Sequence, residues 1–408
     1  MTKVFIGGVV ITPLRTFENG CVVIEGREVS AVGPQERVGY PKDAEIIDVR
    51  GSYVVPGFID MHVHGGGGAD VGDATLEALA TIAQCHARGG TTSFLATTLS
   101  APFDKIERAV KCIQEAKESD LNGAKVLGAH LEGPYFAQAQ RGAQNPAYLK
   151  KPDFEEMIGL VETCPCIRRV SMAPELPGAL PLARELCKRG VQVAIGHSDA
   201  SYRDVLAAIE AGFTHVTHIY SGMSGLKRIN SYRIPGVIES ALLLDELTVE
   251  MIGDGHHLPP SLIRLIIKCK GLDKVALITD AMAAAGMGPG QYSLGGMDVV
   301  VESDVPEQYE VPVQEGSYVA KLLDRKSFAG SVATMEQCVR NVVQLIGLSI
   351  RDALKLASWN PAHMLGIERE RGAIAPGMKA DVVVMDPTFR VRMTMVEGKV
   401  VYRSNEEV

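Results

Sequence analysis

One stretch of the sequence decides the fold of this chain, and it reads Pro56-Gly57-Phe58-Ile59-Asp60-Met61-His62-Val63-His64-Gly65-Gly66-Gly67-Gly68. Its apolar first half is typical of a buried strand. Side chains alternate between the two faces of a strand, so Asp60, His62 and His64 are expected to share one face. Two imidazoles on one face can bind one cation, and the glycines that follow let the backbone turn sharply and approach a ligand closely. A lone His-X-His motif is also compatible with a structural histidine, so its meaning depends on the rest of the chain.

The composition is that of a soluble globular protein and argues against several classes of function. The chain has 408 residues, enough for a barrel-sized domain and a smaller one, with 46% hydrophobic and 22% charged residues. Its formal charge of -8 gives no support to nucleic-acid binding. No apolar run approaches the roughly 20 residues of a membrane-spanning helix, and the N-terminus does not resemble a signal peptide. We therefore expect a cytoplasmic protein with eight reduced cysteines, and with neither nucleic acid nor membrane as a partner.

Short strand-like segments occur at both ends of the chain, separated by Gly, Pro and Asn turns. At the N-terminal end they are residues 3–10, 21–24, 29–32 and 46–49, and at the C-terminal end residues 381–385, 391–396 and 399–402. Neither group can bury both of its faces alone. The pattern predicts one small β-sandwich domain formed from residues 1–54 and 371–408.

Between these ends, residues 55–370 repeat a pattern of strand, loop and helix. The candidate strands are residues 58–64, 91–97, 125–132, 168–173, 191–197, 214–218, 248–254 and 274–280. Helical periodicity is clearest at residues 76–88, 103–117, 180–188, 202–211 and 261–270, with two more helical stretches at 334–345 and 350–358. Eight strands in this alternation predict an α/β fold, a TIM-like (β/α)₈ barrel, rather than a doubly wound sheet. Residues 292–323 are expected to form an inserted hairpin.

Polar residues stand at the ends of these candidate strands. They are His62 and His64 on the first strand, Glu132 on the third, His197 on the fifth, His218 on the sixth and Asp280 on the eighth. The catalytic face of such a barrel lies at the carboxyl ends of its strands. We therefore expect all six side chains to converge there.

Imidazoles with carboxylates suit zinc, iron or another divalent ion, and five such ligands leave room for one or two ions. Asp280, on the last strand, is the natural group to accept a proton from an attacking water and return it to a leaving group. This arrangement predicts hydrolysis of an unreactive bond such as an amide. We interpret His86, His215 and His363 as structural, and the role of His130 stays open.

At this point the motifs resemble a known family. The histidines of strands one, five and six, Asp280 and the segment at residues 372–381 resemble the amidohydrolase superfamily. Within it, the closest likeness is to the N-acetylglucosamine-6-phosphate deacetylases, carried by His62-Val63-His64-Gly65-Gly66, His130-Leu131-Glu132-Gly133-Pro134, Gly196-His197-Ser198-Asp199, Asp254-Gly255-His256-His257 and Thr279-Asp280-Ala281. The resemblance implies a barrel with a flanking β-sandwich, a homodimer, and Glu132 in the ligand position that a carboxylated lysine often fills in other amidohydrolases.

The resemblance also implies contacts to a phosphorylated amino sugar. Gln144 falls where family members carry His or Gln, and His257 falls on a histidine that helps to hold the sugar. Arg233 resembles an arginine that reaches the phosphate bound by a neighbouring subunit, and a guanidinium group suits a phosphate. The sequence departs from the family where Ser221-Gly222-Met223 replaces Asn-Ala-Met, which keeps the backbone amides near the phosphate but not the Asn side chain.

Two alternatives remain open at this stage. The substrate could be a related compound, such as N-acetylgalactosamine-6-phosphate or another N-acyl compound. The chain could instead be a binding module on a degenerate barrel, but the six intact residues at the strand ends argue against that reading.

Overall fold

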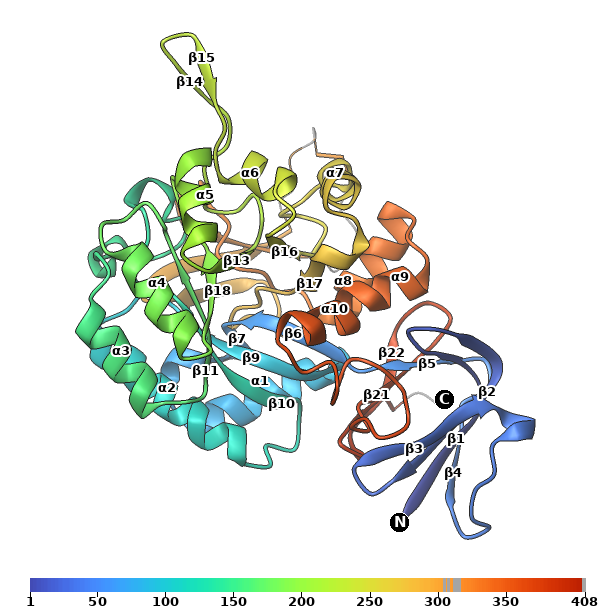
Figure 1. Cartoon of the computed structure of the whole chain (residues 1–408). Helices are drawn as coiled ribbons and strands as arrows, with labels where there is room; N and C mark the ends of the chain where they lie inside the picture. Colours follow the sequence, from blue (N-terminus) through green and yellow to red (C-terminus); the bar gives the residue numbers. More distant parts are fainter. Residues whose placement is uncertain (304–305, 307–308, 311–316, 406–408) are drawn as a thin grey trace.

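The computed structural model describes residues 1–303, 306, 309–310 and 317–405, and its centre is a parallel β-barrel (Figure 1). The barrel strands are β6 (Phe58–Val63), β9 (Thr91–Thr98), β10 (Lys125–Glu132), β11 (Ile167–Met172), β12 (Gln192–Ile195), β13 (Phe213–Val216), β16 (Thr248–Ile252) and β17 (Val275–Ile278), paired in chain order. The first and last strands meet beyond the ladder, where Asp280 N donates to His62 O at 3.0 Å and His64 N to Ala281 O at 2.8 Å. The predicted TIM-like barrel is therefore confirmed.

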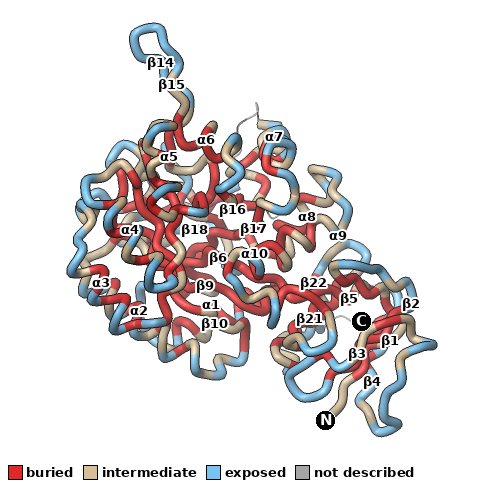
Figure 2. Tube along the Cα trace, in the orientation of Figure 1, coloured by how far each residue is buried: buried red, intermediate tan, exposed pale blue. Residues whose placement is uncertain are grey.

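The barrel strands are largely buried because both of their faces are covered. All residues of β6 and β9 are buried, as expected for parallel strands between a filled interior and a layer of helices (Figure 2). The main core lies between strands and helices and includes Ile82, Val110, Val126 and Leu186. This continuous packing holds the strand ends rigidly, and the polar residues described below stand on those ends.

Helices surround the barrel in Figure 1, and their bounds follow the apolar periodicity. They are α1 (Leu76–Arg88), α2 (Phe103–Glu118), α3 (Phe154–Thr163), α4 (Ala179–Lys188), α5 (Tyr202–Glu210), α6 (Val237–Leu243), α7 (Pro260–Lys270), α8 (Met335–Asn341), α9 (Ile350–Leu354) and α10 (Asn360–Met364). Helix α1 shows why a helix forms at these residues. Thr75 Oγ1 accepts a hydrogen bond from Ala78 N at 3.1 Å and caps the start of the helix, and Leu79 and Ile82 lie on its buried face. Among the described residues, no helix is long and apolar enough to cross a membrane.

Both ends of the chain form one further sheet beside the barrel. Its strands are β1 (Thr2–Ile11), β2 (Thr16–Glu25), β3 (Glu28–Pro34), β4 (Glu45–Asp48), β5 (Tyr53–Pro56), β21 (Val382–Met385), β22 (Val391–Val396) and β23 (Lys399–Arg403). The two ends join where β5 pairs antiparallel with β21, and residues such as Phe5, Val54 and Met393 form the core. The predicted domain from both chain ends is confirmed, as one continuous sheet. Its limits at residues 54 and 371 stay predictions, and β5 runs across the first of them.

Smaller strands lie in the loops that connect the barrel strands and helices. They are β7 (Gly65–Gly66) with β8 (Ala69–Asp70), β14 (Lys227–Ile229) with β15 (Tyr232–Ile234), and β18 (Gly290–Leu294), β19 (Met297–Glu302) and β20 (Val319–Leu322). The hairpin predicted at residues 292–323 is thus a three-stranded antiparallel sheet, and part of the segment between β19 and β20 lies outside the described residues. The β14–β15 hairpin projects away from the barrel at the top of Figure 1.

Candidate metal and active site

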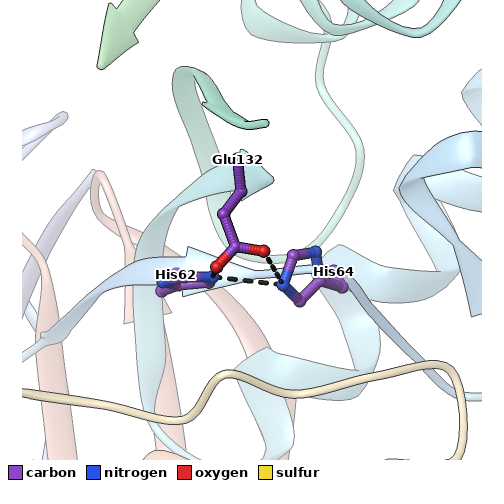
Figure 3. Close-up of side chains that lie close together, drawn as sticks. All are labelled: His62, His64 and Glu132. Atoms are coloured by element: carbon purple, nitrogen blue, oxygen red, sulfur yellow. Dashed lines mark hydrogen bonds and ion pairs between the residues drawn. The ribbon is translucent and has the colours of Figure 1, made fainter. Parts of the chain in front are cut away.

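The two histidines of the opening motif meet Glu132 at the mouth of the barrel (Figure 3). His62 Nε2 lies 3.1 Å from His64 Nε2, and the Glu132 carboxylate lies 3.5 Å from the first nitrogen and 3.4 Å from the second. All three side chains are buried. His62 belongs to β6 and His64 follows it directly, so the strand places both imidazoles next to the carboxylate that ends β10.

The same carboxylate joins a second pair of histidines. Glu132 Oε1 lies 3.3 Å from His197 Nε2 and 2.8 Å from His218 Nε2. Each pair of histidines forms with Glu132 a group whose ligand atoms lie within 4.8 Å of one another. Imidazole nitrogens and carboxylate oxygens that face one another in this way fit one or two divalent ions such as zinc or iron.

Three residues of the site follow their strands in a left-handed backbone conformation. The φ angle is +45° at His197, +26° at His218 and +50° at Asp280. Non-glycine residues rarely adopt such angles, and they cluster at functional sites where the surrounding fold enforces them. The sequence pattern predicted that these three residues are the last residues of their strands. In the structure each strand ends two residues earlier, and the turn that follows directs each side chain across the mouth of the barrel.

Charge pairing keeps the carboxylates of the site ionised. Burial alone raises the pKa of Glu132, but His62, His197 and His218 outweigh it and hold that pKa well below its usual range. Burial likewise opposes ionisation of Asp280, whose pKa is nevertheless lowered by His62 and His64. Asp280 Oδ1 lies 3.1 Å from His64 Nε2 and 3.5 Å from His62 Nε2. Asp280 is therefore ready to accept a proton next to the ligand cluster.

The cluster opens into a cavity of about 270 Å³. His64, Glu132, His197, His218 and Asp280 line its floor, and Gln144, Ser221, Gly222, His257 and Phe328 are among its other lining residues. A cavity with a few convergent polar groups and an apolar wall is typical of a small-molecule site.

Comparison with known proteins agrees with this geometry. The model of the amidohydrolase family matches residues 53–401. The chain belongs to the amidohydrolase family. It is therefore a hydrolase, and the resemblance found in the sequence is confirmed.

Relatives narrow the likeness within this family. The chain is 36% identical over 381 residues to the N-acetylglucosamine-6-phosphate deacetylase of Vibrio furnissii, which covers 93% of this chain and 90% of that protein. It is 35% identical over 372 residues to the N-acetylgalactosamine-6-phosphate deacetylase of Escherichia coli O157:H7, with 91% and 92% covered. A solved structure, a variant of the N-acetyl-D-glucosamine-6-phosphate deacetylase of Mycobacterium smegmatis in complex with N-acetyl-D-glucosamine-6-phosphate, has a TM-score of 0.86 at 33% identity and covers 98% of this chain and 99% of that chain.

Of the residues predicted to contact substrate in this amidohydrolase, four line the cavity: Gln144, Ser221, Gly222 and His257. Gln144 Nε2 donates to Glu132 Oε2 at 2.6 Å, and its Oε1 accepts from Ser100 N at 2.9 Å. Gln144 thus orients the shared carboxylate as well as facing the cavity. His257 Nδ1 donates to Asp254 Oδ2 at 2.8 Å, and its ring packs against Phe328.

Arg233 is the exception. It lies on β15, is exposed, and is not among the residues that line the cavity. The projecting β14–β15 hairpin carries it away from the mouth of its own barrel (Figure 1). Within a single chain, the structure does not bring Arg233 to the site.

His130, whose role the sequence left open, lies beneath the cluster. Its Nε2 pairs with Ser171 Oγ at 2.7 Å and its ring packs on His62 at 4.7 Å between centroids. Burial, and then the charges of His62 and Arg169, hold the pKa of His130 well below its usual value. A neutral, paired imidazole that does not line the cavity supports the ligands rather than reacting.

Two charged residues that lie beneath the ligand cluster were not predicted from the sequence. Glu250 lies in the middle of β16 and Arg169 in β11, and both are completely buried. Both residues lie inside their strands and not at the carboxyl ends, where catalytic residues of a barrel are expected. The available signal was a single acidic residue inside the otherwise apolar run Leu247-Thr248-Val249-Glu250-Met251-Ile252, since buried charges are rare without a partner.

Proposed function

We propose that this chain hydrolyses the acetamide of N-acetylglucosamine-6-phosphate to glucosamine-6-phosphate and acetate. The observation that carries the proposal is the convergence of four histidines and two carboxylates at one cavity, which is lined by His64, Glu132, His197, His218 and Asp280, with His62 directly behind His64 and Glu132. The relatives and the solved complex named above support the choice of substrate. N-acetylgalactosamine-6-phosphate is the second candidate, because a relative of nearly equal identity is named for it.

Glu132, His197 and His218 are proposed to hold one divalent ion, and His62 and His64 together with Glu132 a second. Zinc and iron suit these donors. Such an ion lowers the pKa of water and polarises a carbonyl group, which is the chemistry that amide hydrolysis requires. The barrel strands and the turns that follow them orient these donors, and the loops at the mouth of the barrel shape the cavity.

Asp280 is proposed to move the proton. Its ionised carboxylate borders the cavity next to His64, so it can accept a proton from the attacking water. An amine leaves poorly unless it is protonated, and the same carboxyl group can return the proton to the nitrogen. In the part of the chain that the structure describes, two carboxylates line the cavity. Glu132 faces all four histidines, whereas Asp280 faces His64 and His62 alone among them, so Asp280 is the carboxylate less engaged by the ligands.

Recognition of the sugar phosphate is proposed to involve Gln144, His257, the Ser221-Gly222 turn and Arg233. Arg233 can act only in a second copy of the chain, because its hairpin points away from its own cavity. The hairpin also exposes apolar side chains, with Ile229 54% and Tyr232 75% accessible. These features support a homodimer in which each hairpin reaches the partner's mouth. A cytoplasmic location stays a prediction from the sequence.

Acetate release measured over phosphorylated and unphosphorylated N-acetylhexosamines tests the proposal. We expect the fastest turnover with N-acetylglucosamine-6-phosphate and slow turnover with unphosphorylated sugars. Elemental analysis of protein purified without chelator should find zinc or iron. Absence of acetate release from every phosphorylated N-acetylhexosamine, with metal present, would overturn the assignment.

A further inference from the structure

A fully buried charged layer lies directly beneath the metal-ligand cluster. Glu250 Oε2 accepts from Arg169 Nη1 at 2.8 Å and from His215 Nε2 at 3.1 Å. Its other oxygen, Oε1, accepts from His62 Nδ1 at 2.8 Å. The side chains of Glu250, Arg169, His215 and His62 have no solvent exposure.

A carboxylate in such a place is tolerated only when its charge is matched and its oxygens accept hydrogen bonds. Arg169 Nη1 lies 2.8 Å from Glu250 Oε2, and the guanidinium group of an arginine stays charged in proteins, so Glu250 is the anionic partner of a buried ion pair. An anionic carboxylate can only accept hydrogen bonds. Because His62 Nδ1 must donate to it, the neutral form of this imidazole carries its lone pair on Nε2, the atom that faces His64 and Glu132.

Arg169 keeps Glu250 in position. Its Nε donates to Gln192 Oε1 at 2.8 Å while Nη1 holds Glu250, so the guanidinium group is tied to β12 and β16 at once. Rotation of the Glu250 carboxylate away from His62 would break the bonds to Arg169 and His215 together.

Among the described residues, the other three ligand histidines lack such a partner. His64 Nδ1 pairs with the Thr97 carbonyl at 3.1 Å and His197 Nδ1 with the Gln140 carbonyl at 2.8 Å, while His218 Nδ1 is buried without a hydrogen bond. A carboxylate behind a ligand imidazole fixes the ring and makes it a stronger donor to a metal than a carbonyl does. The support is thus specific to the His62 side of the cluster.

We infer that Glu250, held by Arg169, is a positioning residue that makes the His62–His64 side competent to bind a second divalent ion. The inference rests on the proposed metal site. Oε1 also lies 3.4 Å from His218 N, a longer contact that links Glu250 only to the backbone of the other side.

The decisive variant is Glu250→Gln, studied by titrating metal-free protein with Co²⁺ in the absence of substrate. Wild type should bind two ions. In the variant we expect roughly 10- to 100-fold weaker binding of one ion, the usual effect of removing a partner behind a ligand, and unchanged binding of the other. In a His62→Ala background, Glu250→Gln should have no further effect, because the residue acts through that imidazole.

Two further variants guard against loss of folding. Glu250→Asp keeps the charge opposite Arg169 and withdraws the carboxylate from His62 by one methylene, so the same selective loss is expected in a folded protein. Asp381→Asn is the matched control, because Asp381 is a buried carboxylate paired with Arg371 in the sheet formed by the chain ends. It should lower thermal stability and leave both Co²⁺ affinities unchanged.

Several outcomes would overturn the inference. They are binding of a single ion by wild type, equal loss of both ions in Glu250→Gln, retention of both affinities in folded Glu250→Asp, or additive losses in the His62→Ala background. Since no substrate is used, the result is independent of whether the enzyme deacetylates the proposed sugar.

Discussion

The two sides of the ligand cluster share Glu132 but are supported in different ways. His62 and His64 stand at the end of β6, and His62 is backed by the buried Glu250. His197 and His218 stand on left-handed turns after their strands and have no carboxylate behind them among the described residues. One side therefore depends on buried charge pairing and the other on backbone geometry, so different substitutions should disable them separately.

The largest effect should come from the residue that both sides share. Glu132→Gln removes the negative charge that faces all four imidazoles. We expect metal content to fall to background on both sides and activity to disappear, as measured by elemental analysis and acetate release. A variant that keeps one tightly bound ion would show that one side works without the shared carboxylate.

Asp280→Asn should separate proton transfer from metal binding on both sides. Asparagine keeps the shape of the side chain but cannot shuttle a proton, so kcat should fall by roughly 10² to 10⁴, the usual scale of general acid–base catalysis. Elemental analysis should find the metal retained. Near-normal turnover with full metal would assign the proton transfer to another group.

Arg233→Ala tests a contact that lies outside both sides. Loss of a hydrogen bond to a charged group costs about 1.5–3 kcal/mol, so KM for phosphorylated sugars should rise roughly 10-fold or more. Unphosphorylated sugars are the internal control, and their kinetics should not change. Equal losses on both kinds of substrate would contradict a role in phosphate recognition.

Asp254 is a buried carboxylate that is hydrogen-bonded to His257 at the mouth of the barrel and belongs to neither side of the ligand cluster. Burial opposes its ionisation, but His257 lowers the pKa of Asp254 to about 2 from an ordinary 3.8. A carboxylate whose pKa is lower in the folded protein than in the unfolded chain stabilises the folded protein at any pH above its unfolded pKa. This contribution to the free energy of unfolding, about 2 kcal/mol, should be lost as the pH falls from about 4 to 2. Denaturant titrations of wild type and Asp254→Asn should differ at pH 6 and converge at pH 2; a constant difference would contradict the pairing.

The smallest effect is expected from Gly222→Ala, which should weaken metal binding only on the side of the cluster formed by His197 and His218. Gly222 has φ +57°, and a Cβ there would lie 2.5 Å from His197 Nδ1. Gly222→Ala should cost about 1–2 kcal/mol for the left-handed backbone and should also weaken the ion on His197 and His218. Gly377→Ala, at φ +87° with nothing within 4 Å, is the matched control and should lose only stability. Denaturant titration and Co²⁺ titration measure the two effects, and weaker binding on the His62 side would contradict the separation.

Much of this picture was predictable because it depends on local pattern. The alternation of apolar strands with amphipathic helices predicted the barrel, and the rule that catalytic residues gather at the carboxyl ends of the strands brought His62, Glu132, His218 and Asp280 together. The strand ends were less predictable. A residue in a left-handed turn, such as His197, looks like the last residue of a strand when only the sequence is known.

Glu250 and Arg233 show two different limits of prediction from sequence: one residue was missed, and the other was found but its position in space was not predicted. Glu250 was overlooked because its importance depends on Arg169, 81 residues away in sequence and 2.8 Å away in space. Arg233 was found by resemblance, but its hairpin points away from its own cavity, which no local pattern reveals.

The sequence by itself determined the fold class, the ligand types and the chemistry that they suit, because periodicity and donor chemistry are properties of neighbouring residues. The tertiary structure alone decided that Glu132 is shared by two pairs of histidines, and that one pair rests on a buried charged layer while the other rests on left-handed turns. The physical reason is that ligand geometry and charge pairing act over a few ångströms in space, and closure of the barrel brings strands from distant parts of the chain to that distance.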